Sequence, residues 1–591
     1  MHLPSFVRSC TQVLPVVGLG LLLGACGASE PSRKPATTQV GLPEVPEAKP
    51  NPGWKSGAMV AAANPLAVEA GLEILRQGGS AVDAAIAVQA VLGLVEPQSS
   101  GIGGGAFLMH YSAATGDVVA FDGREVAPRG ATPELFLGAD GKPLPFFRAQ
   151  KSGRSTGVPG AVAMLEMAHR ELGHLPWSAP WQPAIRLASQ GFPVPPRLAL
   201  LLRQAQGMDP LGEDAQQYLM PKGEPVAEGQ VLHNAAYAST LQRIAREGAK
   251  GFYTGPVAQA VVAAARREPL PGTLSLEDLR DYRPQRLQPI CGPYRAYVVC
   301  GMRPPSSGGV AVLSVLGTLA NFDMAANGPD SVRGWHLFVE AQRLAYADRD
   351  MYVGDDRFVQ VPLAGLVDAE YLRSRAALID LTHAMPSVSA GNPPGAARMA
   401  PDSAGGFSGT SHFVIVDARG DVVSMTTTVE SLFGSQRMAA GFFLNNQLTD
   451  FSFLPRGADG LPIANAPAAG KKPRSSMSPT IVFRDGQFEL AVGSPGGNGI
   501  ISYVSKALVG MLDWNLTPQQ AIDLPNVVAR GPVLAEGRLD PALREGLVAL
   551  GHQLGQGRGA EGSGLHAVRV LPDGRLVGGA DSRRDGVARS P

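Results

Sequence analysis

Two threonines mark the open end of a predicted β-hairpin, where their hydroxyl groups would lie close enough for nucleophilic chemistry. The stretch FSGTSHFVIVDARGDVVSMTTT, residues 407–428, predicts two strands joined by a three-residue turn, 418–420, whose last residue is glycine. The register of such a hairpin places Thr410 opposite Thr428. Gly409, just before Thr410, has no side chain that would block attack on its carbonyl group.

These residues are the parts of a self-cleaving precursor. Attack of the Thr410 hydroxyl on the Gly409 carbonyl, followed by hydrolysis of the resulting ester, would make Thr410 a new N-terminus. Its freed α-amine, with an ordinary pKa of about 7.7–8.0, can then act as the base for the hydroxyl of the same residue. Spacing alone favours a simpler interpretation, because threonine is common in ordinary β-hairpins.

Other catalytic patterns are missing from the chain. It contains no G-x-S-x-G nucleophile elbow, no H-E-x-x-H zinc motif and no phosphate-binding P-loop. The glycine-rich stretch 101–106 follows a helical pattern instead of opening one, so it does not fit a dinucleotide fingerprint. No cysteine lies in a context suited to thiolate catalysis. We therefore expect neither a metal ion nor a cofactor.

The overall charge excludes some partners. The chain has 51 basic and 51 acidic residues, so bulk charge does not attract nucleic acid or an anionic membrane. Hydrophobic residues make up 45%, which is normal for a globular protein with a large core. We expect a small-molecule substrate.

The N-terminus predicts export. Residues 1–26 combine Arg8 with an apolar run, Val13–Ala25, that is too short to span a bilayer. The run ends in Leu-Gly-Ala-Cys, which resembles the lipobox of bacterial lipoproteins, so Cys26 is the expected lipidation site. An ordinary signal peptide is the alternative. A proline-rich tether, residues 27–53, follows. We expect a periplasmic protein that contacts the membrane only through this lipid anchor.

The remaining chain predicts an α+β fold. Ser80, followed three residues later by Asp83, predicts the start of a helix that continues to Val95. Residues 157–350 have mostly helical patterns, whereas strand patterns predominate after residue 409. Two sheets with helices outside them would bury these patterns.

Two cysteines flank a second predicted hairpin. Cys291 and Cys300 enclose GPYRAYVV, and a turn near Tyr294-Arg295 would place Cys291 opposite Val298, with Cys300 diagonal to it. A disulfide is feasible in an oxidising compartment. Two buried thiols are equally compatible, because diagonal pairs often miss the required Cα separation.

The first hairpin is similar to the start of the small subunit of γ-glutamyltranspeptidases, which are N-terminal-nucleophile hydrolases. Further blocks in family order include GGSAVDAAIAVQAVLGLVEPQSSGIGGGAFLMHY, FDGREVAP, EAQRLAYADRDMYVGD, FFLNNQLTDFS, RSSMSPTIV and GSPGG. The resemblance implies a four-layer αββα sandwich in which two mainly antiparallel sheets are flanked by helices. It also implies a large subunit, 54–409, and a small catalytic subunit, 410–591, which form a heterodimer made from one precursor.

The resemblance assigns roles in catalysis. It implies that the bond between Gly409 and Thr410 is the processing site and that Thr410 is the nucleophile. Thr428 would hold the new α-amine. Backbone N–H groups of Gly496 and Gly497 would form the oxyanion hole, where glycine lets the backbone approach the tetrahedral centre.

The resemblance also implies six substrate-binding residues, three for an α-carboxylate and three for an α-amine: Arg124, Ser475, Ser476, Glu430, Gln447 and Asp450. Arginine suits a carboxylate because its guanidinium binds it in bidentate fashion. Glu430 departs from the asparagine usual in the family. The segment 452–474 is short and contains no tyrosine, so an aromatic lid is expected to be missing.

The implied activity is that of a γ-glutamyltransferase and glutathione hydrolase. Thr410 would take the γ-glutamyl group from glutathione or another γ-glutamyl compound, and water or an amine would resolve the acyl-enzyme. A related acylase that takes glutaryl or cephalosporin-type amides is one alternative. A catalytically inactive lipoprotein that binds amino acids is the other.

Overall fold

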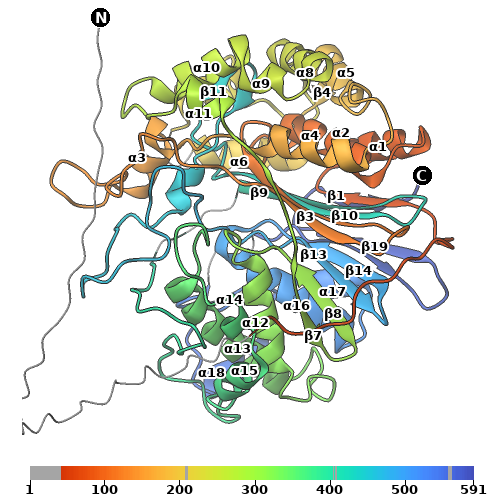
Figure 1. Ribbon diagram of the computed structural model, residues 1–591, viewed down its shortest axis with the longest axis vertical. Helices are drawn as coiled ribbons and strands as arrows, with labels where there is room; N and C mark the ends of the chain where they lie inside the picture. Colours follow the sequence, from red (N-terminus) through yellow and green to blue (C-terminus); the bar gives the residue numbers. More distant parts are fainter. Residues whose placement is uncertain (1–40, 207–209, 404, 406–408, 557–561) are drawn as a thin grey trace, which may run out of the picture. The chain divides into compact units, whose positions relative to one another are not determined.

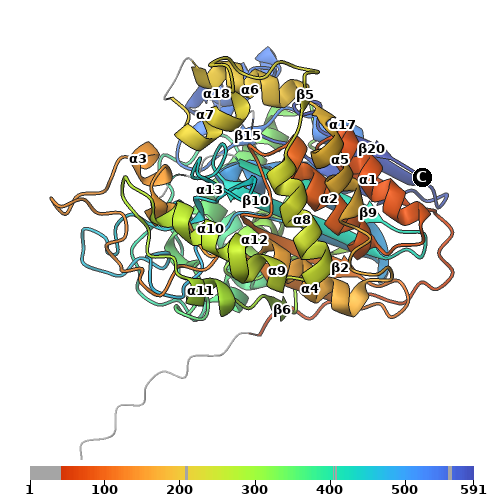
Figure 2. The ribbon, with the colours of Figure 1, turned by 90° about the horizontal axis from the view of Figure 1, so that it is seen from above.

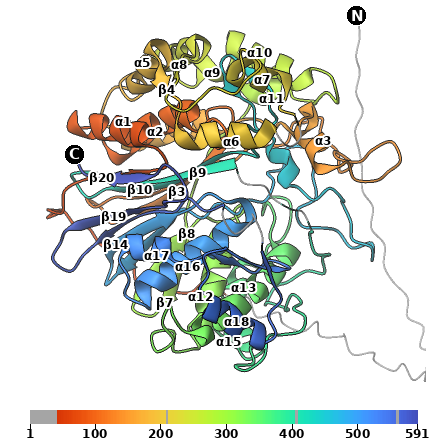
Figure 3. The ribbon, with the colours of Figure 1, turned by 180° about the vertical axis from the view of Figure 1, so that it is seen from behind.

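Two β-sheets lie face to face at the centre of the protein, and helices cover both outer faces (Figure 1). The computed structural model describes residues 41–591 except 207–209, 404, 406–408 and 557–561. All strand pairs between neighbours within the two large sheets are antiparallel. The four layers confirm the predicted α+β sandwich, and Figure 3 shows the same layers from behind.

The first sheet contains the predicted nucleophile hairpin. Its strands in chain order are β1 (Met59–Ala62), β2 (Gly105–Tyr111), β3 (Val118–Gly123), β6 (Gln285–Leu287), β9 (Gly409–Val416), β10 (Val422–Glu430) and β20 (Val587–Arg589). Their spatial order is β20-β1-β9-β10-β2-β3-β6, so β9 and β10 are central strands.

The second sheet is smaller and packs against the inner face of the first. Its strands are β7 (Ile290–Tyr294), β8 (Tyr297–Gly301), β13 (Thr480–Arg484), β14 (Gln487–Gly493), β18 (His566–Val570) and β19 (Leu576–Ala580), in the order β19-β18-β14-β13-β8-β7. Small pairs and a three-stranded sheet use β4 (Phe192–Pro193), β5 (Val231–Leu232), β11 (Met438–Ala439), β12 (Phe442–Phe443), β15 (Val527–Val528), β16 (Val533–Ala535) and β17 (Leu554–Gln556).

One helical layer covers the first sheet (Figure 2). It includes α1 (Pro65–Arg76), α2 (Ala81–Val95), α4 (Ala161–Leu172), α5 (Gln182–Gln190), α6 (Pro196–Gln206), α7 (Glu213–Leu219), α8 (Ala235–Glu247), α9 (Lys250–Tyr253), α10 (Gly255–Arg266) and α11 (Leu276–Arg280). Helix α2 is buried almost throughout because the sheet lies on one side of it and other helices on the other. The predicted capping box is present, since Ser80 and Asp83 each accept the other's backbone N–H.

The other helical layer covers the second sheet. It includes α12 (Gly308–Leu319), α13 (Val332–Tyr352), α14 (Leu363–Leu366), α15 (Ala369–Ala376), α16 (Ile500–Leu512), α17 (Pro518–Asp523) and α18 (Pro541–Ala549). Short elements near the sheet ends are α3 (Phe146–Gln150) and the 3-10 turns η1 (Gly153–Ser155), η2 (Gln447–Asp450) and η3 (Gly497–Gly499). Two of these turns, η2 and η3, lie at the candidate site described below.

The β9–β10 hairpin has the predicted register. Thr410 pairs with Thr428, and Val416 pairs with Val422, which makes the turn symmetric about residue 419. Gly420 ends the turn with φ of +88°, in the left-handed region that glycine tolerates. The sequence therefore fixes the two threonines at the same end of neighbouring central strands.

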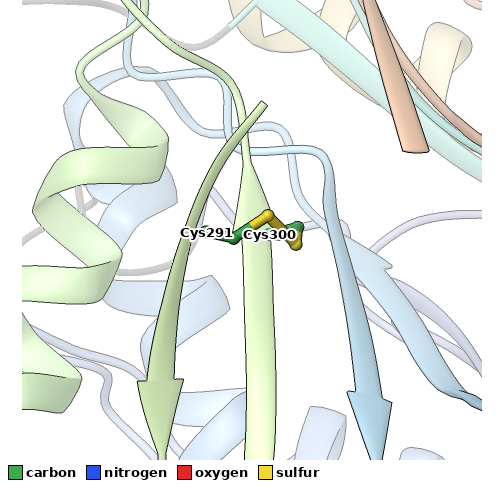
Figure 4. Close-up of a disulfide and its surroundings, with 2 residues drawn as sticks. All are labelled: Cys291 and Cys300. Atoms are coloured by element: carbon green, nitrogen blue, oxygen red, sulfur yellow. A yellow bond between two sulfur atoms is a disulfide. The ribbon is translucent and has the colours of Figure 1, made fainter. Parts of the chain in front are cut away.

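The turn of the second hairpin lies one residue later than predicted, which moves the partner of Cys291 by two positions. Tyr294 pairs with Tyr297 across a two-residue turn, so Cys291 lies directly opposite Cys300 and not opposite Val298. The shift arises because Arg295 takes the left-handed backbone conformation, with φ of +54°. The two cysteines form a disulfide between β7 and β8, with a Cα separation of 4.1 Å (Figure 4).

The N-terminal predictions fall largely outside the described residues. The signal segment 1–26, with Cys26, and the first part of the tether are not described. Residues 41–53, the rest of the predicted tether, contain no helix or strand but contact the folded body. Lys49 donates its N–H to the Gly486 carbonyl at 2.7 Å, and Tyr111 donates its hydroxyl to the Lys49 carbonyl at 2.8 Å. Across the described residues, no helix has the length and apolarity needed to cross a membrane.

Candidate active site

The two hairpin threonines form a short hydrogen-bonded chain that includes the predicted scissile carbonyl. Thr428 Oγ1 donates to the Gly409 carbonyl at 2.8 Å and lies 3.0 Å from Thr410 Oγ1. A hydroxyl has one proton to donate. Since Thr428 uses its proton on Gly409, Thr410 is the donor between the two hydroxyls. The Thr410 hydroxyl therefore directs its proton to Thr428 Oγ1 in the uncleaved chain.

A β-bulge supplies a further contact to this chain. The β9–β10 register shifts between Thr428 and Glu430, and Glu430 has φ of +83°, which is unusual for a residue with a side chain. The shift turns the Glu430 N–H toward Thr428 Oγ1, which accepts it at 2.9 Å. Strained backbone of this kind is found where a site needs a group to be re-aimed.

The backbone carbonyl of Thr410 accepts a hydrogen bond from a buried arginine. Arg584 Nη1 donates to the Thr410 carbonyl at 2.8 Å, and its Nε donates to the Ser563 carbonyl at 3.1 Å. Burial lowers the pKa of Arg584 to about 9. Glu96 lies 3.7 Å from this guanidinium and accepts a hydrogen bond from Ser411 at 2.8 Å. Arg584 thus fixes the backbone of Thr410, and Glu96 fixes the neighbouring Ser411.

The predicted oxyanion glycines form a sharp turn beside the nucleophile. Gly496 has φ of +135° and Gly497 has φ of +56°. A Cβ atom on Gly496 would lie 2.4 Å from the ring of Tyr503, so a larger residue does not fit there. Among the described residues, neither backbone N–H has a hydrogen-bond acceptor. Both groups are thus available to a negatively charged oxygen, as an oxyanion hole requires.

One pocket brings most of the predicted residues together. Gly497 lines it, and Gly496 is its neighbour in the chain. The other predicted residues in the lining are Thr410, Thr428, Arg124, Glu430, Gln447, Asp450, Ser475 and Ser476. They come from β3, β9, β10, η2 and the loop before β13, so residues more than 350 positions apart in sequence share a single pocket.

Arg124 lies at the end of β3 with its guanidinium oriented by the backbone. Its Nε donates to the Pro473 carbonyl at 3.1 Å, and its Nη2 donates to the Arg474 carbonyl at 2.9 Å. Nη2 also pairs with Asp450 at 2.5 Å. The side chain is fully buried except where it meets the pocket. A fixed, buried guanidinium is suited to bind a carboxylate.

The two acidic residues of the pocket differ in their hydrogen-bond partners and in their exposure. Asp450 accepts from Arg124 and from Gln447 Nε2, the latter at 2.7 Å, and its side chain is 21% exposed. It therefore faces the pocket as a carboxylate that can meet an ammonium group. Glu430 also lines the pocket, but Ser431 and Asn446 both donate to its Oε2. Both carboxylates thus already have partners: an arginine and an amide at Asp450, and a hydroxyl and an amide at Glu430.

A second wall of the pocket consists of residues that the sequence reasoning did not select. Arg349 Nη2 donates to Ser476 Oγ at 2.6 Å and to Asn498 Oδ1 at 2.9 Å. Burial, together with the nearby Arg474, lowers the pKa of Arg349 to about 10. Arg474 pairs with Asp402 at 2.7 Å. Arg349 and Arg474 both lie in the sequence blocks quoted above, but Arg349 belongs to a helix with several other charged residues and Arg474 to a loop, so neither had a local signal.

Glu125, next to Arg124, is an unusual buried carboxyl group. Burial raises its pKa to about 8. Among the described residues, neither of its side-chain oxygens has a hydrogen-bond partner, and Arg124 Nη1 lies 3.7 Å away. Below pH 8 this group is mainly neutral, so it adds no second negative charge beside the Arg124–Asp450 pair.

Comparisons with known proteins find relatives that align over most of the chain. A family model described as gamma-glutamyltranspeptidase matches residues 67–590. The chain is 36% identical to the glutathione hydrolase proenzyme of Bacillus subtilis (strain 168), over 90% of this chain and 91% of that protein. It is 35% identical to the glutathione hydrolase proenzyme of Escherichia coli (strain K12), over 98% of each. The crystal structure of cephalosporin acylase from Bacillus halodurans superposes with a TM-score of 0.80 at 28% identity, covering 95% of this chain and 98% of that one.

Proposed function

Because the chain belongs to the γ-glutamyltranspeptidase family, we propose that it is a γ-glutamyltransferase and glutathione hydrolase that cleaves itself to expose Thr410 as its nucleophile. The observation that carries this proposal is the chain of contacts from Thr410 through Thr428 to the Gly409 carbonyl. It lies in the same pocket as a buried arginine and a partly exposed aspartate, which suit the two charged groups of a γ-glutamyl substrate.

Self-cleavage follows from the contacts at Gly409. Thr410 Oγ1 gives up its proton and attacks the Gly409 carbonyl carbon, while Thr428 donates to the carbonyl oxygen as negative charge develops there. The bond between that carbon and the Thr410 nitrogen then breaks, and the nitrogen takes a proton. Water hydrolyses the ester that remains, which leaves a carboxylate on Gly409 and a free hydroxyl and amine on Thr410.

Turnover uses the groups that cleavage releases. The Thr410 α-amine accepts the proton of its own hydroxyl, and the oxygen attacks the γ-carbonyl carbon of the substrate. The N–H groups of Gly496 and Gly497 stabilise the negative oxygen of the tetrahedral intermediate. The amine half then leaves with a proton. Water attacks the γ-glutamyl ester to give glutamate, or an acceptor amine attacks it to give a new γ-glutamyl amide.

Substrate selection depends on the charged ends of the pocket. Arg124, with Ser475 and Ser476 nearby, would bind the α-carboxylate. Asp450 would bind the α-amine, helped by Gln447, which orients its carboxylate. A glutaryl group lacks that amine, so it would leave the Asp450 carboxylate facing an apolar chain. The geometry therefore favours γ-glutamyl amides over glutaryl amides.

The location of the enzyme is part of the same proposal. The sequence of residues 1–26 supports export and lipidation of Cys26, which would tether a two-chain enzyme to the membrane on the periplasmic side. Metabolic labelling with a radioactive fatty acid tests this point. Labelled wild-type protein and an unlabelled Cys26→Ala variant support the anchor, whereas equal labelling of both overturns it.

The activity is tested by processing and turnover together. We expect the purified protein to migrate as two chains, with the shorter one beginning Thr-Ser-His-Phe by Edman sequencing, and Thr410→Ala to remain one inactive chain. A γ-glutamyl anilide should be hydrolysed much faster than a glutaryl anilide. Faster turnover of the glutaryl compound would indicate an acylase instead. A single wild-type chain without turnover of either would indicate a binding protein.

A further inference from the structure

A cavity of about 680 Å³ lies beside the catalytic pocket, and the chemistry described above does not use it. Its size falls in the range of small-molecule binding sites, about 300–1,000 Å³. Its apolar lining includes Leu144, Phe146, Phe453, Leu454 and Ile463. The polar side chains in the lining are those of Ser403, Thr449, Ser452, Arg456 and Asp459. A mostly apolar surface with few polar groups is typical of a site for an organic ligand.

The cavity and the catalytic pocket share a wall. The turn η2 gives Gln447 and Asp450 to the pocket and Thr449 to the cavity. Gly405 lines both. A single 3-10 turn, η2, therefore separates the pocket around Thr410 from the cavity. The two spaces are close enough for different parts of one substrate.

Aromatic packing fixes one part of the apolar lining, and another part is exposed to solvent. Phe453 stacks on Phe136 with ring centroids 4.6 Å apart and is nearly parallel to Phe146 at 6.4 Å. Figures 1 and 3 both show α3, which begins with Phe146, beside the cyan segment that contains η2. Leu454 is 44% exposed. An apolar ligand that covered these side chains would remove their surface from water, which is favourable.

We propose that this cavity binds the amine half of the substrate and favours amines that carry an aromatic or branched aliphatic group. The inference rests on the proposed function. The γ-glutamyl half is the same in every such substrate, is short, and has both of its charged groups matched in the catalytic pocket. Apolar surface can therefore enter the cavity only from the amine, which is the leaving group of the donor or the incoming acceptor.

Paired substrates with one apolar and one small amine test the inference. The measurement is kcat/KM for hydrolysis of γ-glutamylphenylalanine and of γ-glutamylglycine by the self-cleaved enzyme. We expect wild type to prefer γ-glutamylphenylalanine. Phe453→Ala should lower kcat/KM for that substrate about 10- to 100-fold, as loss of a buried phenyl contact predicts, and should leave γ-glutamylglycine nearly unchanged.

A matched control is available next to the cavity. Phe147 is 52% exposed, lies beside Phe146 and is not part of the lining. Phe147→Ala should therefore change neither substrate. A second variant, Phe453→Leu, keeps an apolar side chain of moderate size and should recover part of the preference. This variant separates a lost contact from a disturbed fold, because both variants must still cleave themselves to be assayed.

Each result decides one question. The inference is overturned if wild type has equal kcat/KM for the two substrates. It is also overturned if Phe453→Ala and Phe453→Leu lose kcat/KM equally for both, because the cavity then does not distinguish one amine from another. Such results leave the proposed function intact, since γ-glutamylglycine is still hydrolysed by wild type. If wild type hydrolyses neither substrate, the proposed function fails, and the inference that rests on it fails for that separate reason.

Discussion

Replacing Thr428 by valine keeps the shape of the side chain and removes one hydroxyl from the centre of the site. That hydroxyl donates to the Gly409 carbonyl, receives the Thr410 proton and accepts the Glu430 N–H. Its loss should both slow self-cleavage and destabilise the fold. The variant therefore tests whether the Thr428 hydroxyl takes part in self-cleavage or only supports the fold.

The magnitude follows from the two kinds of contact. Loss of one donor to a developing oxyanion costs about 2.7–4 kcal/mol of barrier, which slows cleavage about 100- to 1,000-fold. The Glu430 N–H and the Gly409 carbonyl would each lose a partner in a buried site. Such a group costs about 1–3 kcal/mol when it is left unsatisfied. We therefore expect a folded but less stable precursor that cleaves very slowly.

The assay is the rate of conversion of precursor to two chains on denaturing gels, with thermal unfolding measured on the same samples. Thr428→Ser retains the hydroxyl and should cleave nearly as fast as wild type. Thr427→Val is the matched control, because Thr427 is equally buried and its hydroxyl makes only a long contact, 3.4 Å, to the Gly105 carbonyl. Cleavage of Thr428→Val at the wild-type rate would refute the assigned role of this hydroxyl.

Three further predictions concern binding, pH and stability. Asp450→Asn should raise KM for a γ-glutamyl anilide about 10- to 100-fold, because a hydrogen bond to a charged group contributes about 1.5–3 kcal/mol. Steady-state kinetics with a glutaryl anilide should show no such rise in KM. Since burial raises the pKa of Glu125 to about 8, ionisation above that pH places a negative charge beside Arg124. KM measured against pH should rise there more steeply in wild type than in Glu125→Gln, in which only loss of the substrate's ammonium charge contributes. A paired Cys291→Ala and Cys300→Ala variant should unfold with about 2–3 kcal/mol less stability, by denaturant titration, and keep its activity.

The sequence predicted the catalytic hairpin well because its signals are local. A three-residue turn that ends in glycine sets one register, and that register decides which residues face Thr410. The cysteine hairpin shows the limit of the same reasoning. There, Arg295 adopts a left-handed conformation that favours glycine or asparagine, so composition alone did not locate the turn.

The residues that sequence reasoning did not find act across long distances in the chain. Arg584 reaches the Thr410 carbonyl from near the C-terminus, and Arg349 reaches Ser476 from the last turn of α13. Neither has a local pattern, since an arginine in a helix or near a chain end usually faces water. Only the packing of the two sheets and their helices brings these side chains to the pocket. The cavity lined by Phe146 and Phe453 is equally a product of that packing.

The position of the scissile bond explains how a cleaved protein would stay together. Strands on opposite sides of the bond pair with each other in both sheets: β1 with β9 and β20, β2 with β10, and β8 with β13. Cleavage between Gly409 and Thr410 breaks none of these strand pairs, because both residues lie at the start of β9. The buried core between the sheets also includes residues from both sides, such as Phe107 and Val414. The proposed cleavage would therefore free an amine at the site while hydrogen bonds and apolar packing continue to hold Thr410 in place.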